Sequence, residues 1–346
     1  MRSFLLVACL LAGAAVAAQP TGAWRASTAE EQRLDAIAFE GFDQDIGRRL
    51  TDIQSVVVVS RGRIAYEYHR DDNPQALRDT QSVAKSALAA LVGAALGQGL
   101  IASLDRPVVE LLPEWRALNA DPRSRAITLR HLLAMTAGFD VADAAGTARP
   151  LAPDQAWARP LRSPPGESFA YDNSVVNLVA AILERVTGRP LADYAREQLV
   201  RPLGMLEPSY RGGLRLRTVD MAKLGQLFLQ DGMWDDQALL PPGFAAFATR
   251  AHSRGGPPVQ LPYGLSWWAP SDSTYFASGY GGQFIWVHAP LGAVVALTSA
   301  VSPQSQQRGQ ALQFIRGRLF QALQKHDGSR ERAQRHEPAA NASEVQ

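Results

Sequence analysis

The chain has 346 residues, of which 46% are hydrophobic and 20% are charged, and its formal net charge is +2. These values are ordinary for a soluble globular protein, and the length allows one large domain or two closely joined ones. The small net charge, without a basic run interleaved with aromatic residues, excludes nucleic acid as an expected partner.

Residues 1–18 have the pattern of a secretory signal peptide. Arg2 gives the positive start, an apolar stretch follows, and small residues precede the expected cleavage site. The segment before Cys9 resembles a lipoprotein cleavage box, but the apolar run continues past Cys9, so we favour cleavage near residue 18. No later segment has the roughly 18 uncharged apolar residues of a membrane span. We therefore expect a periplasmic or secreted protein without an integral membrane span.

Cysteine and histidine usage limits the chemistry further. Cys9 is the only cysteine, so the mature chain has no thiol for catalysis, disulfides or a zinc site. Neither His131 nor His288 has a second histidine or carboxylates at metal-ligand spacing. We expect neither a metal nor a cofactor.

The predicted elements change from strands to helices and back to strands. Hydrophobic periodicity and turn residues define them. In chain order they are a helix at 28–50, a β-hairpin at 55–59 and 64–69, a buried helix at 82–98, helices at 129–137, 175–187, 191–199 and 218–230, strands at 263–268, 275–280, 283–288 and 293–300, and a closing helix at 305–325.

The early hairpin and the late strands are expected to share one antiparallel sheet, because a lone hairpin is marginally stable in water. The helical block between them is then an insertion, and Ser82 lies where the two parts meet. We predict an α/β (α+β) fold with a sheet domain at 19–81 and 215–325, a helical domain at 82–214 and a disordered tail at 326–346.

Ser82 and Lys85 are one helical turn apart, so their side chains lie on one helix face. Lysine occurs only three times in the chain, at 85, 223 and 325, among 35 lysines and arginines. A buried lysine can lose its proton and act as a base, whereas an arginine cannot. The pair can therefore activate a serine without histidine, although so short a motif also arises by chance. Lys223 and Lys325 are interpreted as solvated surface charges.

A turn at Pro165-Gly166 leads to a second group of candidate residues. Tyr171 can act as a general acid or base beside Lys85, and Asn173 can hold the lysine and the substrate. The alternative is a buried aromatic residue beside a turn-forming asparagine.

The segment Ala277–Gln283 is rich in glycine, which weakens a strand unless another group must approach its backbone. On an edge strand beside Ser82, the Tyr280 N–H would join the Ser82 N–H in an oxyanion hole. A simple glycine-rich hairpin turn is the alternative.

In their order and spacing, Ser82-x-x-Lys85, Tyr171-x-Asn173 and the glycine-rich strand resemble the active-site elements of the β-lactamase-related serine hydrolases. This group includes class C β-lactamases, D-alanyl-D-alanine carboxypeptidases, family VIII esterases and 6-aminohexanoate-dimer hydrolases. The resemblance runs from about residue 55 to 320 and implies an antiparallel sheet flanked by N- and C-terminal helices, with an inserted helical domain. Further matching segments are 128–138, 202–205 and 263–268.

The resemblance also implies a role for each candidate residue. Ser82 would be the acylated nucleophile, Lys85 its base and Tyr171 the general acid/base. The substrate-binding and oxyanion positions would be Asn173, Ser278, Gly279 and Tyr280.

One departure from the family pattern narrows the substrate. β-Lactamases and carboxypeptidases carry Lys-Thr-Gly, and many relatives His-Thr-Gly, where this chain has Ala277-Ser278-Gly279. Ala277 cannot hold the carboxylate of a penicillin or a peptidoglycan terminus, and Asp172 adds an anion unless it faces away. We therefore favour the nylon-oligomer hydrolase and esterase branch and a small amide or ester substrate.

Two alternatives remain. One is a D,D-carboxypeptidase or class C-type β-lactamase with a peptidoglycan-derived or β-lactam substrate. The other is a catalytically inactive binding or sensor domain, although such a role does not require a serine, a lysine and a tyrosine together. The oligomeric state stays open.

Overall fold

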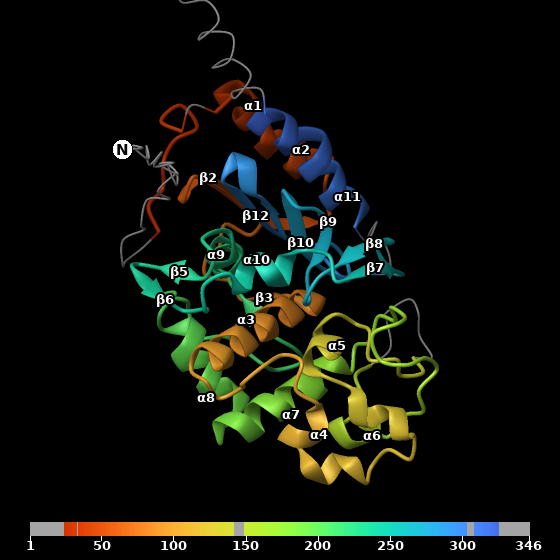
Figure 1. Ribbon diagram of the computed structural model, residues 1–346. Coiled ribbons are helices and arrows are strands. Elements are labelled where there is room, and N and C mark those ends of the chain that lie inside the picture. Colours follow the sequence, from red (N-terminus) through yellow and green to blue (C-terminus); the bar gives the residue numbers. More distant parts are fainter. Residues whose placement is uncertain (1–23, 33, 142–148, 303–307, 325–346) are drawn as a thin grey trace, which may run out of the picture.

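The computed structural model describes residues 24–32, 34–141, 149–302 and 308–324. The predicted signal peptide at 1–18 and the predicted tail at 326–346 lie outside the described residues, as does Lys325. Figure 1 shows a sheet with helices on both faces and a separate block of helices below it. No helix in the described ranges combines the length and apolarity needed to cross a membrane.

Within the described residues, one antiparallel sheet of eight strands has the order β2-β1-β12-β11-β10-β9-β8-β7. The early hairpin pairs directly with the last strand, and Val57 lies opposite Ala296. The expected shared sheet and the α+β fold class are confirmed. The strand bounds are β1 Ile53–Ser60, β2 Arg63–His69, β7 Ser253–Gly256, β8 Leu261–Tyr263, β9 Trp268–Ser271, β10 Thr274–Gly279, β11 Gln283–His288 and β12 Ala293–Ser299.

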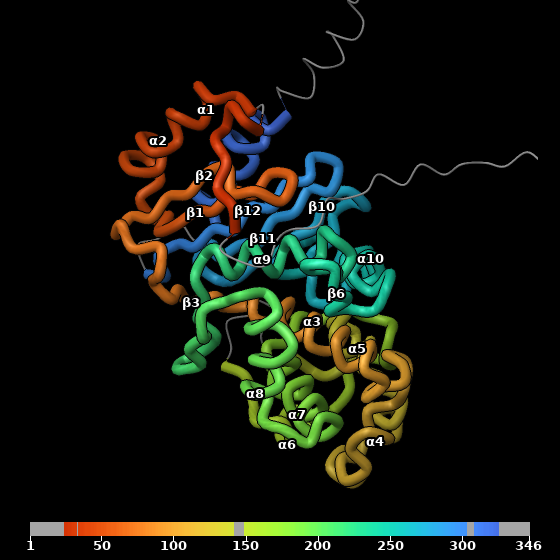
Figure 2. The backbone as a smooth tube through the Cα atoms, turned by 90° about the vertical axis from the view of Figure 1, so that its left-hand side faces the viewer, coloured from red at the N-terminus to blue at the C-terminus, as the bar shows by residue number. Residues whose placement is uncertain are grey.

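Helices cover both faces of this sheet, which is why the valines of β1 are buried on both sides. One face carries α1 (Ala36–Glu40), α2 (Phe42–Arg48) and α11 (Gly309–Leu312) with its continuation η6 (Gln313–Leu319) (Figure 1). The other face carries α9 (Thr218–Leu229) and α10 (Phe244–Thr249), and α3 (Ala84–Gly97) lies below these two helices (Figures 1 and 2).

The N- and C-terminal helices pack against each other through aromatic rings, and the Phe42 and Phe314 centroids are 5.2 Å apart. The flanking helices are therefore as expected, except that the predicted helix at 28–50 is too long. Residues 29–32 form turns, and the helix is interrupted at Gly41.

The helical block lies on the side of α3 that faces away from the sheet (Figures 1 and 2). The chain enters and leaves it through the paired segments β3 (Arg78–Asp79) and β4 (Arg215–Leu216). The exact domain boundaries at 82 and 214 stay a prediction. The block contains α4 Val108–Leu111, α5 Leu129–Leu133, α6 Pro153–Trp157, α7 Val175–Thr187 and α8 Leu191–Ala195, which continues as η4 Arg196–Val200.

The predicted strand at 263–268 is wrong, because a tight turn divides it between β8 and β9. Ser266 has a φ of 61°, a conformation that interrupts a strand. Gly264 packs so closely that an added Cβ would lie 2.3 Å from the carbonyl oxygen of Ala248. Both features depend on tertiary packing.

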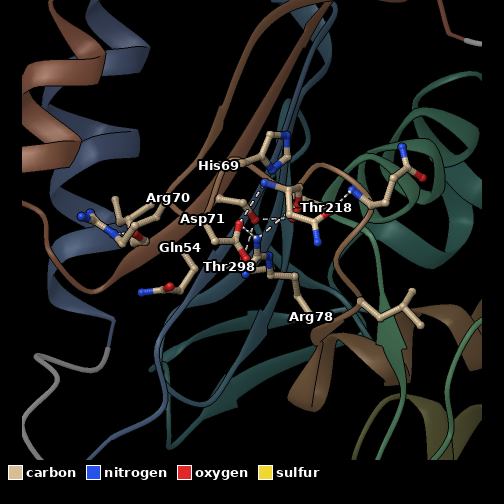
Figure 3. A network of polar contacts seen from close by, with 12 residues as sticks. Gln54, His69, Arg70, Asp71, Arg78, Thr218 and Thr298 are labelled. Carbon is tan, nitrogen blue, oxygen red and sulfur yellow. Dashed lines mark hydrogen bonds and ion pairs between the residues drawn. The ribbon is translucent and has the colours of Figure 1, made fainter.

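A buried polar contact joins the start of α9 to the sheet. Ser55 of β1 bonds to Thr298 of β12 at 2.6 Å and also to Thr218 of α9. Figure 3 shows Thr218 and Thr298 at this contact, and it shows Arg70 at the left, toward the helices of the opposite face. Arg70 donates to the carbonyl oxygens of Ile53 at 2.7 Å and Ile46 at 2.8 Å, which fastens α2 to β1.

The prediction that Lys223 is a solvated surface charge is wrong, because its side chain is only 6% exposed. Its Nζ donates to the carbonyl oxygen of Gly204 at 2.6 Å and lies 3.5 Å from the Asp220 carboxylate. Burial lowers the pKa of Lys223 although Asp220 opposes this effect. The lysine therefore fastens α9 to the 203–206 segment.

Gly225 lets α9 lie close to the sheet, and we predict that Gly225→Ala destabilises the protein by about 1–3 kcal/mol through overpacking. An added Cβ would be 2.6 Å from side-chain atoms of both Ile285 and Val294. The free energy of unfolding, measured by urea denaturation, tests this. The control is Gly317→Ala, where an added Cβ meets nothing within 4 Å. Equal stability of the two variants would contradict this packing.

Candidate active site

Ser82 lies in the 3-10 turn η1 (Gln81–Val83), which runs directly into α3. In the first turn of a helix the N–H groups lack intrahelical acceptors, and the helix dipole favours negative charge. Gln81 has a φ of 49°, a strained conformation for a residue with a Cβ. Asp79 stabilises it by accepting hydrogen bonds from the Gln81 backbone N at 2.9 Å and from Nε2 at 2.7 Å. The backbone beside the serine is therefore fixed.

Lys85 joins two of the predicted site residues. It is 3% exposed, and its Nζ lies 2.9 Å from Ser82 Oγ and 2.9 Å from Asn173 Oδ1. Ser82 and Lys85 share one face of the helix, whereas Asn173 comes from the segment before α7. The Lys85 amine thus contacts a residue that is 88 positions away in the chain.

The Tyr171 ring packs against this amine, and Lys85 Nζ lies 4.8 Å from the ring centroid. Tyr171 stacks on Trp268 with centroids 6.0 Å apart and an interplanar angle of 12°. Among the contacts of the described residues, no hydrogen bond joins the Tyr171 hydroxyl to Ser82 or Lys85. Lys85 therefore faces the ring of Tyr171 and not its oxygen.

Tyr263 is a second phenol in this aromatic cluster, with its ring 6.3 Å from that of Tyr171. Burial, and to a lesser extent the nearby Tyr171, raises the pKa of Tyr263 well above its usual range. Tyr263 therefore stays protonated and neutral, and it supports the Tyr171 ring without providing a base.

Asp172 faces away from the pocket. Its side chain is buried and forms an ion pair with Arg159, and it accepts a hydrogen bond from the Ser174 backbone at 2.8 Å. The expected repulsion of anionic substrates by Asp172 is therefore absent. The ion pair instead fixes the segment that carries Tyr171 and Asn173.

As a whole β10 is an interior strand, because it pairs with both β9 and β11, but its pairing with β9 ends at Phe276. The expected edge is therefore present only locally, at Ala277–Gly279, which pair with β11 alone. The end of β10 reaches the segment before Ser82. An added Cβ at Gly279 would lie 2.7 Å from the carbonyl oxygen of Thr80 and 2.8 Å from Gln81 Cβ. A glycine is therefore needed for this close approach.

The remaining residues of this segment differ in whether they reach the cavity. Ala277 and Ser278 are buried and do not line the cavity described below, whereas Tyr280 is 47% exposed and does line it. Gln283 fixes the adjoining turn, because its side chain bonds to both the backbone N and the carbonyl oxygen of Ser299.

A cavity of about 670 Å³ opens onto Ser82, Lys85, Asn173 and Tyr280. Its other walls are mainly apolar and come from α3, α7, α8 and α9. Sequence reasoning missed these walls, as it missed Asp79 and Gln81. The helical spacing of Ala84, Ala87, Leu88 and Leu91, which places them on one face, is the signal that could have indicated one wall. In the described ranges, no group of three or more His, Cys, Asp or Glu residues is arranged to hold a metal.

Esterase EstB of Burkholderia gladioli is 29% identical in an alignment of 262 residues, and the match covers 67% of this chain and 64% of the esterase. The match therefore covers slightly less than two thirds of that relative.

Solved structures show the same fold. A candidate β-lactamase from Bacteroides dorei superposes with a TM-score of 0.71 and 17% identity, covering 84% of this chain and 99% of that one. A candidate 6-aminohexanoate-dimer hydrolase from Bacillus anthracis gives a TM-score of 0.68 at 18% identity and covers 90% of each chain.

The family model named Beta-lactamase matches residues 48–317, which include the early hairpin, the helical block and the start of the closing helix. The serine, the lysine and the glycine-rich strand all lie within this range. The chain belongs to the β-lactamase family.

Proposed function

We propose that the protein is a serine esterase that cleaves small-molecule carboxylic esters through an acyl-enzyme at Ser82. The observation that carries this proposal is the 2.9 Å contact between Lys85 Nζ and Ser82 Oγ in a cavity large enough for a small ligand. The similarity to esterase EstB favours an ester. Ala277 offers no cation for the carboxylate that β-lactams and peptidoglycan termini carry.

In the first step, the Lys85 amine accepts the proton of the Ser82 hydroxyl through its lone pair while Oγ attacks the ester carbonyl carbon. Another N–H of the amine can keep the contact with Asn173 Oδ1. The ammonium that forms lies over the face of the Tyr171 ring, which favours a cation. This ring therefore stabilises the charge that develops during attack.

The carbonyl oxygen becomes an oxyanion in the same step. The N–H groups of Ser82 and Tyr280 are proposed as its donors, because Gly279 brings the end of β10 against the segment before Ser82. Gln81 and Asp79 keep the Ser82 backbone in place and act as positioning residues.

The tetrahedral intermediate then collapses, and its bond to the alcohol oxygen breaks. Lys85 returns the proton to this oxygen, while the Tyr171 ring beside the amine contributes through its face and not through its hydroxyl. Water attacks the acyl-enzyme by the reverse sequence, giving the carboxylic acid and free Ser82.

We predict that Lys85→Arg lowers kcat/KM for p-nitrophenyl acetate by roughly 10²–10⁴-fold, because an arginine cannot accept the serine proton. Lys85→Met is expected to lose as much. Steady-state kinetics measure the effect, and thermal unfolding reports whether each variant is folded.

The matched control is Lys223→Arg, which changes another buried lysine that does not contact Ser82. This variant should keep its activity toward the acetate ester within a few-fold. If Lys85→Arg is folded and also retains its activity, lysine is not the base.

The ester assignment is tested by comparing p-nitrophenyl acetate, a chromogenic cephalosporin and a linear 6-aminohexanoate amide at equal enzyme concentration. We expect kcat/KM for the ester to exceed the other two values by at least about 100-fold, because an ester has the better leaving group and needs no carboxylate-binding cation. Faster turnover of the cephalosporin would assign a β-lactamase instead. Absence of turnover of all three by folded protein would favour an inactive binding domain.

A further inference from the structure

The cavity extends far beyond the groups that the reaction needs. Ser82, Lys85, Asn173 and Tyr280 occupy one part of its lining, and the remaining lining reaches α7, α8 and α9 in the helical block. A volume of about 670 Å³ is many times that of an acetyl group. The unused volume indicates that a larger part of the substrate is bound there.

Helix α3 gives the direction and the length of this space. The cavity is lined by Ser82 of η1 and by one face of α3, formed by Ala84, Ala87, Leu88 and Leu91, with Lys85 beside it. Leu91 is nine residues after Ser82, which is about 13 Å along a helix that rises about 1.5 Å per residue. An extended alkyl chain advances about 1.3 Å per carbon, as its bond lengths and angles dictate, so this distance accommodates roughly ten carbons.

The walls of this extension are apolar and incompletely covered. Leu88, Val176 and Ala180 line the extension and are only partly buried. Leu199 and Leu216 also line it and are almost fully buried. Apolar surface that is left open beside a reactive serine favours an apolar ligand group.

The charged residues that line the cavity do not supply a binding partner for a polar acyl group in this extension. Asp79 is engaged by Gln81 next to the serine, and Lys85 is engaged by Ser82 and Asn173. Arg149 is exposed to solvent. A charged or strongly polar acyl group placed between Leu88 and Leu199 would lose its hydration without gaining a partner of opposite charge from these residues.

We propose that the extension binds the acyl chain of the substrate, which makes the protein specific for esters of medium-chain fatty acids of about eight to ten carbons. This inference rests on the proposed esterase function. Ser82 Oγ bonds to the carbonyl carbon of the fatty acyl group, the bond to the alcohol oxygen breaks, and the alcohol leaves with the proton that Lys85 carried. Water then releases the fatty acid and restores Ser82.

The test is a series of p-nitrophenyl esters from acetate to hexadecanoate, assayed below their micelle concentrations. We expect kcat/KM to rise by up to about fourfold for each added methylene, which is the burial gain per methylene expressed as a rate ratio. The increase should end near ten carbons, where the cavity is filled.

Ala180→Phe places bulk about two turns into α7 and is expected to lower the decanoate-to-acetate ratio of kcat/KM by at least tenfold. Leu191→Trp adds bulk from α8 and keeps the test available if the first variant does not fold. The matched control is Ala246→Phe on an exposed position of α10, which should leave the ratio unchanged.

The outcomes separate this inference from the esterase proposal. Normal hydrolysis of the acetate with kcat/KM constant or falling from acetate to decanoate would overturn the acyl-chain site and leave the esterase function intact. An unchanged ratio in both folded cavity variants would also overturn it. Absence of hydrolysis of every ester, acetate included, would reject the esterase function itself.

Discussion

The structure of the site depends on one buried amine, Lys85 Nζ, held between Ser82 Oγ and Asn173 Oδ1. A buried amine is costly unless its polar neighbours are placed accurately, so the surrounding parts must be rigid. The Ser82–Lys85 spacing is fixed by a single helix. The position of Asn173 depends on the fold of the helical block, because it lies 88 residues away in the chain.

Several features outside the reacting groups maintain this arrangement. The Arg159–Asp172 ion pair fixes the segment between the aromatic ring and the amide, and Trp268 stacks on Tyr171 from the sheet side. Gly279 allows β10 to approach the segment before the serine. The site therefore lies where the sheet meets the helical block, and both parts contribute to it. The same junction opens into the apolar cavity, so the chemistry and the substrate-binding space share the walls of α3.

Much of the fold could be predicted from local sequence patterns. The alternation of residues 64–69 and the apolar run of 55–59 identified the hairpin, and the helical periodicity of 175–187 identified α7 with its observed bounds. The Ser82–Lys85 pair was also predictable, because one helical turn fixes its geometry. The break at Ser266, the interior position of β10 and the burial of Lys223 were not predictable, since each depends on contacts with distant segments. For the same reason, sequence alone gave no indication of the cavity's depth.

The most direct test of the account is to locate the covalent adduct. The protein is incubated with diethyl p-nitrophenyl phosphate, and intact and peptide mass spectrometry follow. We predict one diethylphosphoryl group per chain, attached to Ser82 in the peptide that contains it. The adduct should be absent from Ser82→Ala. It should be retained in Ser86→Ala, because the Ser86 hydroxyl is bonded to the Ser266 carbonyl oxygen. An adduct on another residue, or no adduct on folded protein, would contradict the assignment of Ser82 as the nucleophile.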